Sequence, residues 1–195
     1  MFLKPSTLNS LMKQAYKSGL TVARAEDDWL YIAGRYWEVS VKKDFIPKRT
    51  LGDIITLAGE LPCPGERFTA TKEGNQIETE MPLKVRAEPF AERDALTVTD
   101  VILVGTSGTV QRLLQDEITG NIYVINNVFA SIIDNSLIDK DHGEYAVGDP
   151  LFNPDYGILW QNNVCKLRAQ FRLDEKNNKV LENLKGADIT PEVAG

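Results

Sequence analysis

The chain has 195 residues, a hydrophobic fraction of 43% and a formal net charge of −6. This length suits one large domain or two small ones, with enough apolar material for a buried core. There is no run of about 18 apolar residues, and the first ten residues lack the apolar stretch of a signal peptide, so no membrane partner is expected. Cys63 and Cys165 are far apart in sequence, which predicts reduced thiols and a cytoplasmic location.

The charge is distributed unevenly along the chain. Residues 1–50 hold nine Lys or Arg and five Asp or Glu, a balance of +4, so the remainder carries −10. Affinity for phosphate comes from clustered cations, so an acidic chain is a poor general binder of nucleic acid. One cationic face is nevertheless compatible with this composition. The alternative is an unevenly charged surface that only contacts solvent.

Residues 6–18 predict a helix, with Pro5 and Ser6 as its start signal, Ser6 as the N-cap and Gly19 as the residue that ends it. Lys13 and Lys17 lie one turn apart on its polar side. The apolar positions repeat at helical spacing and form one stripe: Leu8, Leu11, Met12 and Ala15.

Three strands are expected next, in residues 19–26, 29–32 and 36–41. Gly34 is expected to supply a positive φ between the second and third strands. The aromatic residues of this region could stack on bases if they are exposed, or they divide between the two faces of a hairpin and serve mainly as core. They are Trp29, Tyr31, Tyr36 and Trp37.

A second helix is predicted within residues 46–66, and residues 67–81 predict a hairpin. Thr50 and Asp53 resemble a capping box at the start of this helix. Its apolar stripe comprises Leu51, Ile54, Ile55, Ala58 and Leu61.

The expected fold class is α+β: two β-rich halves with short helices packed on antiparallel sheet. The boundaries we infer are 1–85 for the first domain, 86–95 for a linker, 96–174 for the second domain and 175–195 for a polar, loosely held tail. Residues 127–134 suit either a short helix or a strand.

Residues 27–41 and 119–133 align without a gap at an offset of 92 positions. Tyr31 meets Tyr123, and Trp37 meets Phe129. Most of this match pairs one apolar residue with another, which two unrelated hairpins would also produce. We interpret it as an internal duplication of a hairpin that closes a sheet in each half.

No catalytic motif emerges, so the chain is not expected to be an enzyme or to need a cofactor. His142 is the one histidine, and the sequence "VGTSGT" lacks the spacing of a nucleophile elbow. Asp139, Asp141 and Glu144 lie close enough in sequence to hold Ca²⁺ or Mg²⁺. The EF-hand pattern is not met, and a solvated acidic loop is the other interpretation.

The segments "LNSLMKQAY", "GLTVARAEDDWLYIAGRYWEVSV" and "IPKRTLGDIITLAGELPCPGERFTATKEGNQIETE" follow one another in the order helix, strands, Pro-led helix and hairpin. Residues 7–82, under half of the chain, thereby resemble one domain of a DNA sliding clamp. The second half departs from this pattern, because it lacks a Pro-led helix. The whole chain also resembles small proteins of bacterial phages and mobile elements, a group that implies no settled activity.

The resemblance to clamps implies a non-catalytic protein whose helices face DNA and whose sheets assemble into rings. The cations it places toward DNA are Lys13, Lys17, Lys48 and Arg49. A six-domain ring would need three two-domain chains. The alternatives are a module that binds protein or itself through its sheet edges without binding DNA, and a small metal-dependent hydrolase that uses the acidic loop.

Overall fold

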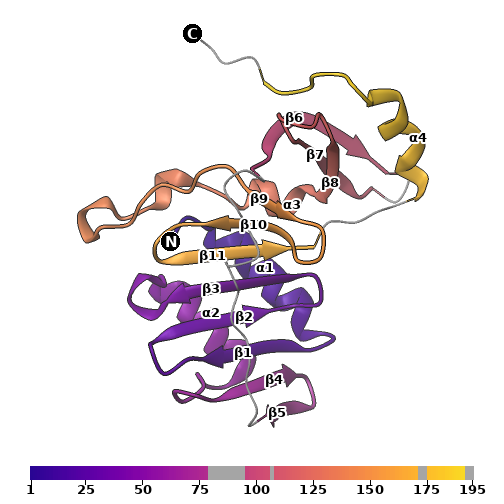
Figure 1. The fold of residues 1–195 in the computed structure, drawn as a ribbon. Coiled ribbons are helices and arrows are strands. Elements are labelled where there is room, and N and C mark those ends of the chain that lie inside the picture. The colour runs from indigo at the N-terminus through magenta and orange to yellow at the C-terminus, as the bar shows by residue number, and fades with distance from the viewer. Residues whose placement is uncertain (79–94, 106–107, 171–174, 192–195) are drawn as a thin grey trace. The chain divides into compact units, whose positions relative to one another are not determined.

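The chain forms two units, and a computed structural model describes residues 1–78, 95–105, 108–170 and 175–191. The first unit comprises Met1–Arg86, Ile132–Val147 and Gln161–Arg168. The second comprises Ala87–Ser131, Gly148–Trp160 and Ala169–Gly195. Each unit is therefore built from segments that lie far apart in sequence, as the colours of Figure 1 show. Apart from Ala95, the expected linker lies outside the described residues.

The first unit begins with helix α1, Pro5–Tyr16. The predicted apolar stripe is confirmed, because Leu8, Leu11, Met12 and Ala15 are all buried. The expected N-cap is wrong: the cap is Lys4, which makes no side-chain capping bond, and the helix starts at Pro5. The ring of proline fixes φ near the helical value and its missing N–H costs nothing in the first turn, so Pro5 is itself the start signal.

Antiparallel strands follow α1 in the order that the sequence predicts. The strands are β1 (Leu20–Arg24), β2 (Trp29–Ala33), β3 (Trp37–Lys42), β4 (Arg67–Thr71) and β5 (Gly74–Glu78). Their order in the sheet is β5-β4-β1-β2-β3, and β11 (Cys165–Ala169) lies beside β3. The Lys42 N–H donates to the Val164 carbonyl at 2.9 Å, which joins a late segment of the chain to an early strand.

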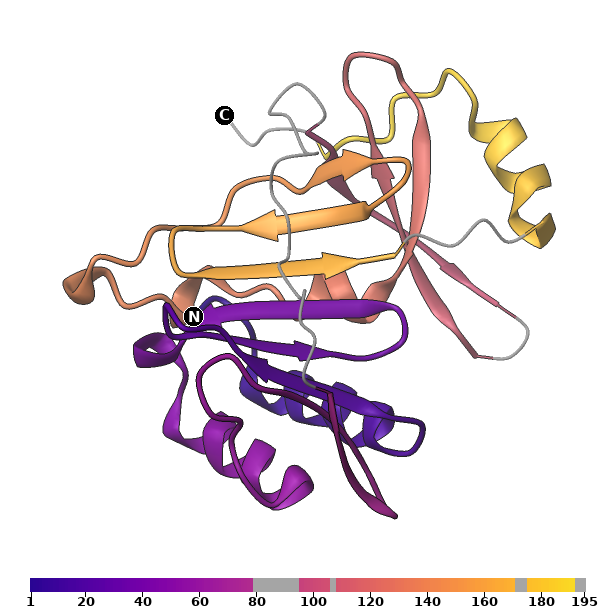
Figure 2. The ribbon, with the colours of Figure 1, turned by 60° about the horizontal axis from the view of Figure 1, so that its bottom comes forward.

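Helix α2, Lys48–Ala58, follows the short 3₁₀ helix η1, Lys43–Phe45. The expected capping box is wrong, because Pro47 is the N-cap and Thr50 lies inside the first turn with 1% of its surface exposed. Ile54 and Ala58 are buried with Thr50, whereas Ile55 is 44% exposed. The buried stripe is thus rotated from the predicted one. Figures 1 and 2 show α1 and α2 on the same side of the sheet.

Gly34 is needed for space and not for a positive φ, which corrects the sequence prediction. It is absent from the residues with positive φ, and Asp28, with φ of 63°, has that conformation in the turn before β2. A Cβ on Gly34 would lie 2.6 Å from the Trp37 indole nitrogen and 3.1 Å from the Cβ of Ala15. The buried Trp37 ring therefore occupies the place of a side chain at position 34.

The second unit contains a three-stranded antiparallel sheet in the order β6-β7-β8. These strands are Thr97–Val104, Val110–Gln115 and Ile122–Asn126. Helix α3, Asn127–Ser131, follows β8 directly. Strands β9 (Leu151–Asn153) and β10 (Gly157–Gln161) pair with each other, and Ala95 bridges to Leu151.

The internal sequence match covers one strand and not a hairpin. Tyr31 and Tyr123 both lie in strands, β2 and β8. Trp37 lies in β3, but Phe129 lies in the helix α3. Of the ambiguous segment 127–134, residues 127–131 form this helix, and Ile133 lies beyond it in an isolated antiparallel bridge with Leu3. A duplicated hairpin is therefore not present at residues 119–133.

The segment expected as a loose tail contains helix α4, Glu175–Leu184. The side chain of Gln115, 4% exposed, binds the backbone that follows this helix. Its Nε2 donates to the Ala187 carbonyl at 2.7 Å, and its Oε1 accepts from the Ile189 N–H at 2.8 Å. A buried amide that uses both its donor and its acceptor in this way holds the end of the segment against β7.

The described residues thus form an α+β fold with short helices and antiparallel sheets, as the sequence predicts.

Replacing Gly34 with Ala should lower the free energy of unfolding by about 1–3 kcal/mol, because the added methyl displaces the Trp37 ring. Equilibrium unfolding in urea measures the change.

Gly52 provides the matched control inside α2. It has no atom within 4 Å of an added Cβ and no positive φ. Gly52→Ala should raise the free energy of unfolding by about 0.5–1 kcal/mol, because alanine has the higher helix propensity. A Gly34→Ala protein as stable as the wild type would show that the close approach of Trp37 is wrong.

Candidate functional site

The sheet of the first unit has an inner face that packs under α1 and α2 and an outer face on the other side. Alternation along the strands decides the division: Val22, Ile32 and Val39 point inward and are fully buried. We define the outer face by the residues of β1–β4 and β11 that alternate with this buried layer. Its charged and aromatic members are Trp29, Tyr31, Glu38, Lys42, Arg67, Lys166 and Arg168.

Among these described strands the outer face carries four cations and one carboxylate. The carboxylate is Glu38, which forms an ion pair with Arg168. Burial lowers the pKa of the Arg168 guanidinium, but its reference value is so high that it stays charged at neutral pH. On the described strands, the carboxylate of Glu38 is thus paired with Arg168, and Lys42 and Lys166 lie on the same face.

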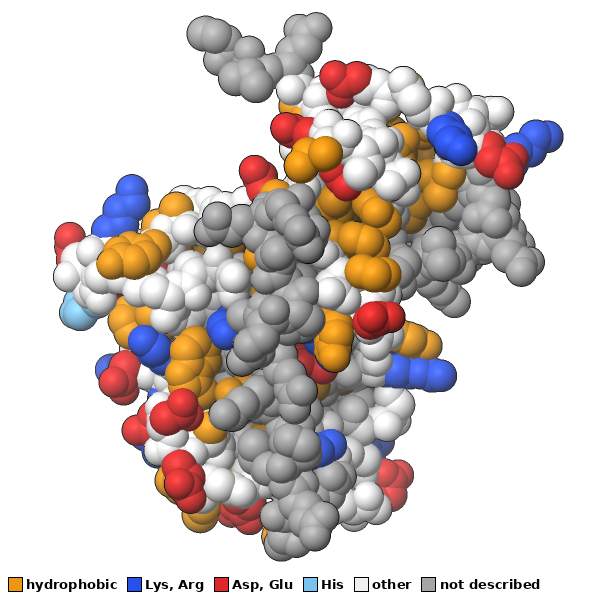
Figure 3. Space-filling model, in the orientation of Figure 1, with side chains coloured by type: hydrophobic (Ala, Val, Ile, Leu, Met, Phe, Trp, Pro, Cys, Tyr) orange, Lys and Arg blue, Asp and Glu red, His pale blue; other side chains and the backbone are white. Residues whose placement is uncertain are grey.

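Trp29 lies at one end of the outer face, and two lysines of the neighbouring strands β3 and β11 approach its ring. The Lys42 and Lys166 amines are each 5.8 Å from the centroid of the indole ring. The register of β2 and β3 places Lys42 opposite Trp29, and the bond from Lys42 to Val164 brings the start of β11 alongside. We call these three residues the indole site. Figure 3 shows Lys and Arg side chains beside hydrophobic ones on this side of the first unit.

Two further aromatic side chains of the first unit are exposed. Tyr145 is 68% exposed, and its N–H donates to Asn163 Oδ1 at 3.1 Å in the turn that leads into β11. Tyr36 is 52% exposed in the turn between β2 and β3, and the Arg35 guanidinium carbon lies 5.2 Å from its ring centroid. Between these ends, burial raises the pKa of the Tyr31 hydroxyl, with a smaller contribution from Asp27.

The four cations singled out from the sequence are all exposed, but they do not form one cluster. Lys13 and Lys17 lie at the end of α1, which leads into the start of β1. Lys48 and Arg49 begin α2, which follows the end of β3. Because β1 starts at one end of the antiparallel sheet and β3 finishes at the other, the two pairs lie at opposite ends of the helical layer.

The acidic loop is organised by a buried ion pair. The Met1 amine lies 2.6 Å from Glu144 Oε2, and both side chains have no exposed surface. Glu144 also accepts from the Asp139 N–H at 3.0 Å and from Asn162 Nδ2 at 3.2 Å. The buried Glu144 carboxylate is therefore engaged by three partners inside the protein.

The other two acidic candidates for a metal lie on the surface of the same loop. Asp139 Oδ2 lies 2.7 Å from His142 Nδ1, and the hydrogen bond with His142 holds the pKa of Asp139 below its usual value. Asp141 is exposed. Within the described ranges, no group of three His, Cys, Asp or Glu side chains is arranged to hold a metal ion.

Both cysteines are free thiols, with Cys63 exposed and Cys165 buried. Burial raises the pKa of the Cys165 thiol, and the Met1 amine and Glu144 carboxylate act on it in opposite directions. A buried thiol with a raised pKa is a poor nucleophile. Cys165 therefore serves as an apolar residue of the inner layer.

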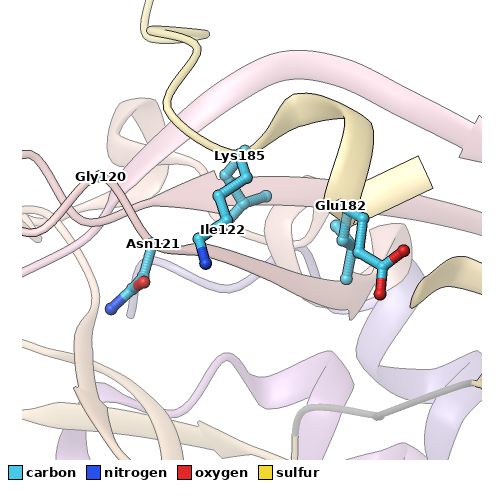
Figure 4. A pocket seen from close by; sticks show the side chains of 6 residues that line it. Gly120, Asn121, Ile122, Glu182 and Lys185 are labelled. Atoms are coloured by element: carbon cyan, nitrogen blue, oxygen red, sulfur yellow. The ribbon is translucent and has the colours of Figure 1, made fainter. Parts of the chain in front are cut away.

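The second unit has a shallow pocket of about 310 Å³ between the start of β8 and α4 (Figure 4). Its described lining consists of Gly120, Asn121, Ile122, Leu181, Glu182 and Lys185. Figure 4 shows the side chain of Glu182, on α4, and that of Lys185, directly after α4, pointing away from each other.

Comparison with known proteins gives no relative: no protein-family model and no curated sequence matches the chain. In the part of the chain that the structure describes, none of the helices combines the length and apolar character that crossing a membrane requires. The functional conclusion therefore depends on the surface of the molecule itself.

Glu144→Gln should lower the free energy of unfolding by about 3 kcal/mol, because it leaves the buried Met1 ammonium without an opposite charge. Asp141→Asn, in the same loop but exposed, is the control and should change it by less than about 0.5 kcal/mol. Urea unfolding of both variants gives the comparison. Equal stability of the two would mean that the ammonium is not held in a buried pair.

Proposed function

We propose that this chain is a non-catalytic nucleic-acid-binding protein and that the outer face of the first unit is its contact surface. The observation that carries this proposal is the indole site: a partly exposed tryptophan with two lysine amines near its ring, on a sheet face whose described strands carry four cations and one carboxylate paired with Arg168. Such a combination of ring and charge suits a ligand that has both aromatic faces and regularly spaced negative charge.

The two lysines of the indole site suit contact with phosphates, which does not depend on the base sequence. The lysine ammonium is a compact charge on a flexible stem, which can reach a backbone phosphate without reading a base edge. Each cation that neutralises a phosphate releases counterions, so affinity falls steeply as salt rises. A local positive surface can act in this way although the whole chain is acidic, because salt screens the distant charges over about 10 Å.

The resemblance of residues 7–82 to a clamp domain supports DNA association but points to the helical side, with Lys13, Lys17, Lys48 and Arg49. That side has its cations divided between two ends of the layer. On the outer face, the Lys42 and Lys166 amines both lie 5.8 Å from the centroid of one partly exposed ring, that of Trp29. We therefore favour the outer face, and the two surfaces can be compared directly.

The test uses two double variants with the same change in net charge. Lys42→Glu with Lys166→Glu reverses the indole site, and Lys13→Glu with Lys17→Glu reverses the exposed end of α1. Fluorescence anisotropy of a labelled oligonucleotide gives the affinity across a range of salt concentrations.

The outer-face variant should bind about tenfold more weakly or worse at low salt, and its salt slope should fall by about 1.4 if each lysine neutralises one phosphate of a single strand. The α1 variant should bind within about twofold of the wild type, because its charges lie on the other side of the sheet. The reverse result would favour the clamp-like arrangement and remove the outer face from consideration. Circular dichroism of both variants checks that the fold is retained.

A second candidate function is self-association through strand β6. This strand is at the edge of its three-stranded sheet, and Ile102 and Val104 are 47% and 69% exposed. Exposed apolar residues on an unpaired edge favour pairing with another strand. A second copy of the same strand is a suitable partner, because antiparallel pairing about a two-fold axis brings apolar side chains together without opposing like charges.

Ile102→Lys should reduce the solution mass to that of one chain if β6 forms such a dimer, because charged residues on an edge oppose pairing. Ile118→Lys is the control: Ile118 is 80% exposed but lies in the turn between β7 and β8. Multi-angle light scattering across concentration measures the mass. A wild-type protein that is monomeric at all concentrations would contradict the β6 dimer.

A further inference from the structure

We infer, on the basis of the proposed function, that the ligand is single-stranded nucleic acid, whose bases stack on Trp29 while its phosphates contact Lys42 and Lys166. This deepens the proposal, because contact with phosphate alone would not distinguish a single strand from a duplex. The position of the Trp29 ring relative to its neighbours supports this inference.

Trp29 is the exception among the three tryptophans of the chain. Trp37 and Trp160 are 7% and 2% exposed, whereas Trp29 is only partly buried. The alternation that buries Leu30 and Ile32 against the helices places Trp29 on the outer face. A large aromatic ring left partly open to solvent on a charged face is available to a ligand with an aromatic surface.

Both lysine amines lie close to the indole ring of Trp29. Each amine is 5.8 Å from the indole centroid, within the range of a cation–π interaction. Stacking of a nucleobase on an aromatic side chain is the stronger interaction of the two. A base can therefore displace the amines from the ring, and their flexible stems let them move to the phosphates on either side of that base.

A duplex cannot make this contact, since its base faces are stacked on one another inside the helix. A single strand exposes them, and every base has an aromatic face, so stacking tolerates any sequence. Two other exposed rings of the first unit offer the same chemistry: Tyr36, with Arg35 over it, in the turn between β2 and β3, and Tyr145, whose N–H bonds to Asn163 in the turn before β11. Several consecutive nucleotides would thus find an aromatic or cationic partner.

The experiment titrates the full chain with four 12-nucleotide probes: oligo(dT), oligo(rU), a hairpin duplex and an abasic deoxyribose-phosphate strand. Anisotropy gives the affinity, and intrinsic tryptophan emission gives a second readout. Because Trp37 and Trp160 are buried, a ligand-dependent loss of emission reports on Trp29. Trp29→Leu removes the aromatic face, and Trp29→Phe is the matched control that retains one.

We expect oligo(dT) or oligo(rU) to bind about tenfold or more tightly than the duplex and the abasic strand, and to quench the emission. Trp29→Leu should weaken this binding by about fivefold or more, whereas Trp29→Phe should retain most of the affinity and lose the quenching. Tighter binding of oligo(dT) would identify the ligand as DNA, and tighter binding of oligo(rU) would identify it as RNA. Equal binding would mean that the site recognises only what both share, the bases and the phosphates.

Three results would overturn the inference, and they can be told apart. If the duplex and the abasic strand bind as tightly as oligo(dT), the contact is with phosphate alone, and the proposed function stands without base stacking. If no probe binds at 50 mM salt, the proposed function fails together with the inference. If Trp29→Leu keeps the affinity and the salt dependence of the wild type, the bases do not stack on Trp29.

Discussion

The pairing of β11 with β3 is the constraint on which the candidate site depends. The bond from the Lys42 N–H to the Val164 carbonyl joins positions that are 122 residues apart in the chain. It brings Lys166 to the Trp29 ring and Arg168 to Glu38. The side chain of Asn162 fixes the turn before β11. Its Oδ1 accepts from the Val164 and Cys165 N–H groups. Its Nδ2 donates to the Glu144 carboxylate and to the Tyr145 carbonyl. Without this pairing, the outer face would lose half of its cations.

Strand alternation explains why charge and aromatic character meet on one surface. The centre of the inner layer is apolar because α1 and α2 cover it, so Glu38, Lys42 and Arg67 lie on the other face, and the exception is Arg24 at the end of β1. Glu38 is balanced by Arg168, while Lys42 and Lys166 have only an aromatic ring as their described neighbour across the site. The distribution of charge is therefore a product of packing in the core as much as of the composition of the surface.

Much of the first unit follows from local pattern. The stripe of α1, the alternation of β3 and the hairpin of β4 and β5 depend on neighbours a few residues apart, and all are present in the structure. The failures share a cause in three-dimensional contact. Gly34 accommodates the Trp37 ring, which no turn rule reveals, and Phe129 enters a helix although Trp37, its counterpart in the sequence match, enters a strand.

The candidate site illustrates the same limit. Alternation at Cys165, Lys166, Leu167 and Arg168 predicts a strand with a cationic side. Nothing in that pattern indicates which strand becomes its neighbour, so the association of Lys166 with Trp29 requires the fold. Likewise, the spacing of Asp139, Asp141 and Glu144 permits a common ligand. In the structure, however, Glu144 is buried against the Met1 amine, a partner that lies 143 residues away in the sequence.

The interleaving of the two units has a consequence for biosynthesis. At a translation rate of about 5–20 residues per second, the 122 residues that separate Lys42 from Val164 take about 6–24 s to make. During that time β3 has emerged with a bare edge, and residues destined for the second unit are being added. An unpaired edge strand is prone to pair with other chains. Nascent chains on neighbouring ribosomes are thus exposed to mispairing until the last strand of the first unit arrives.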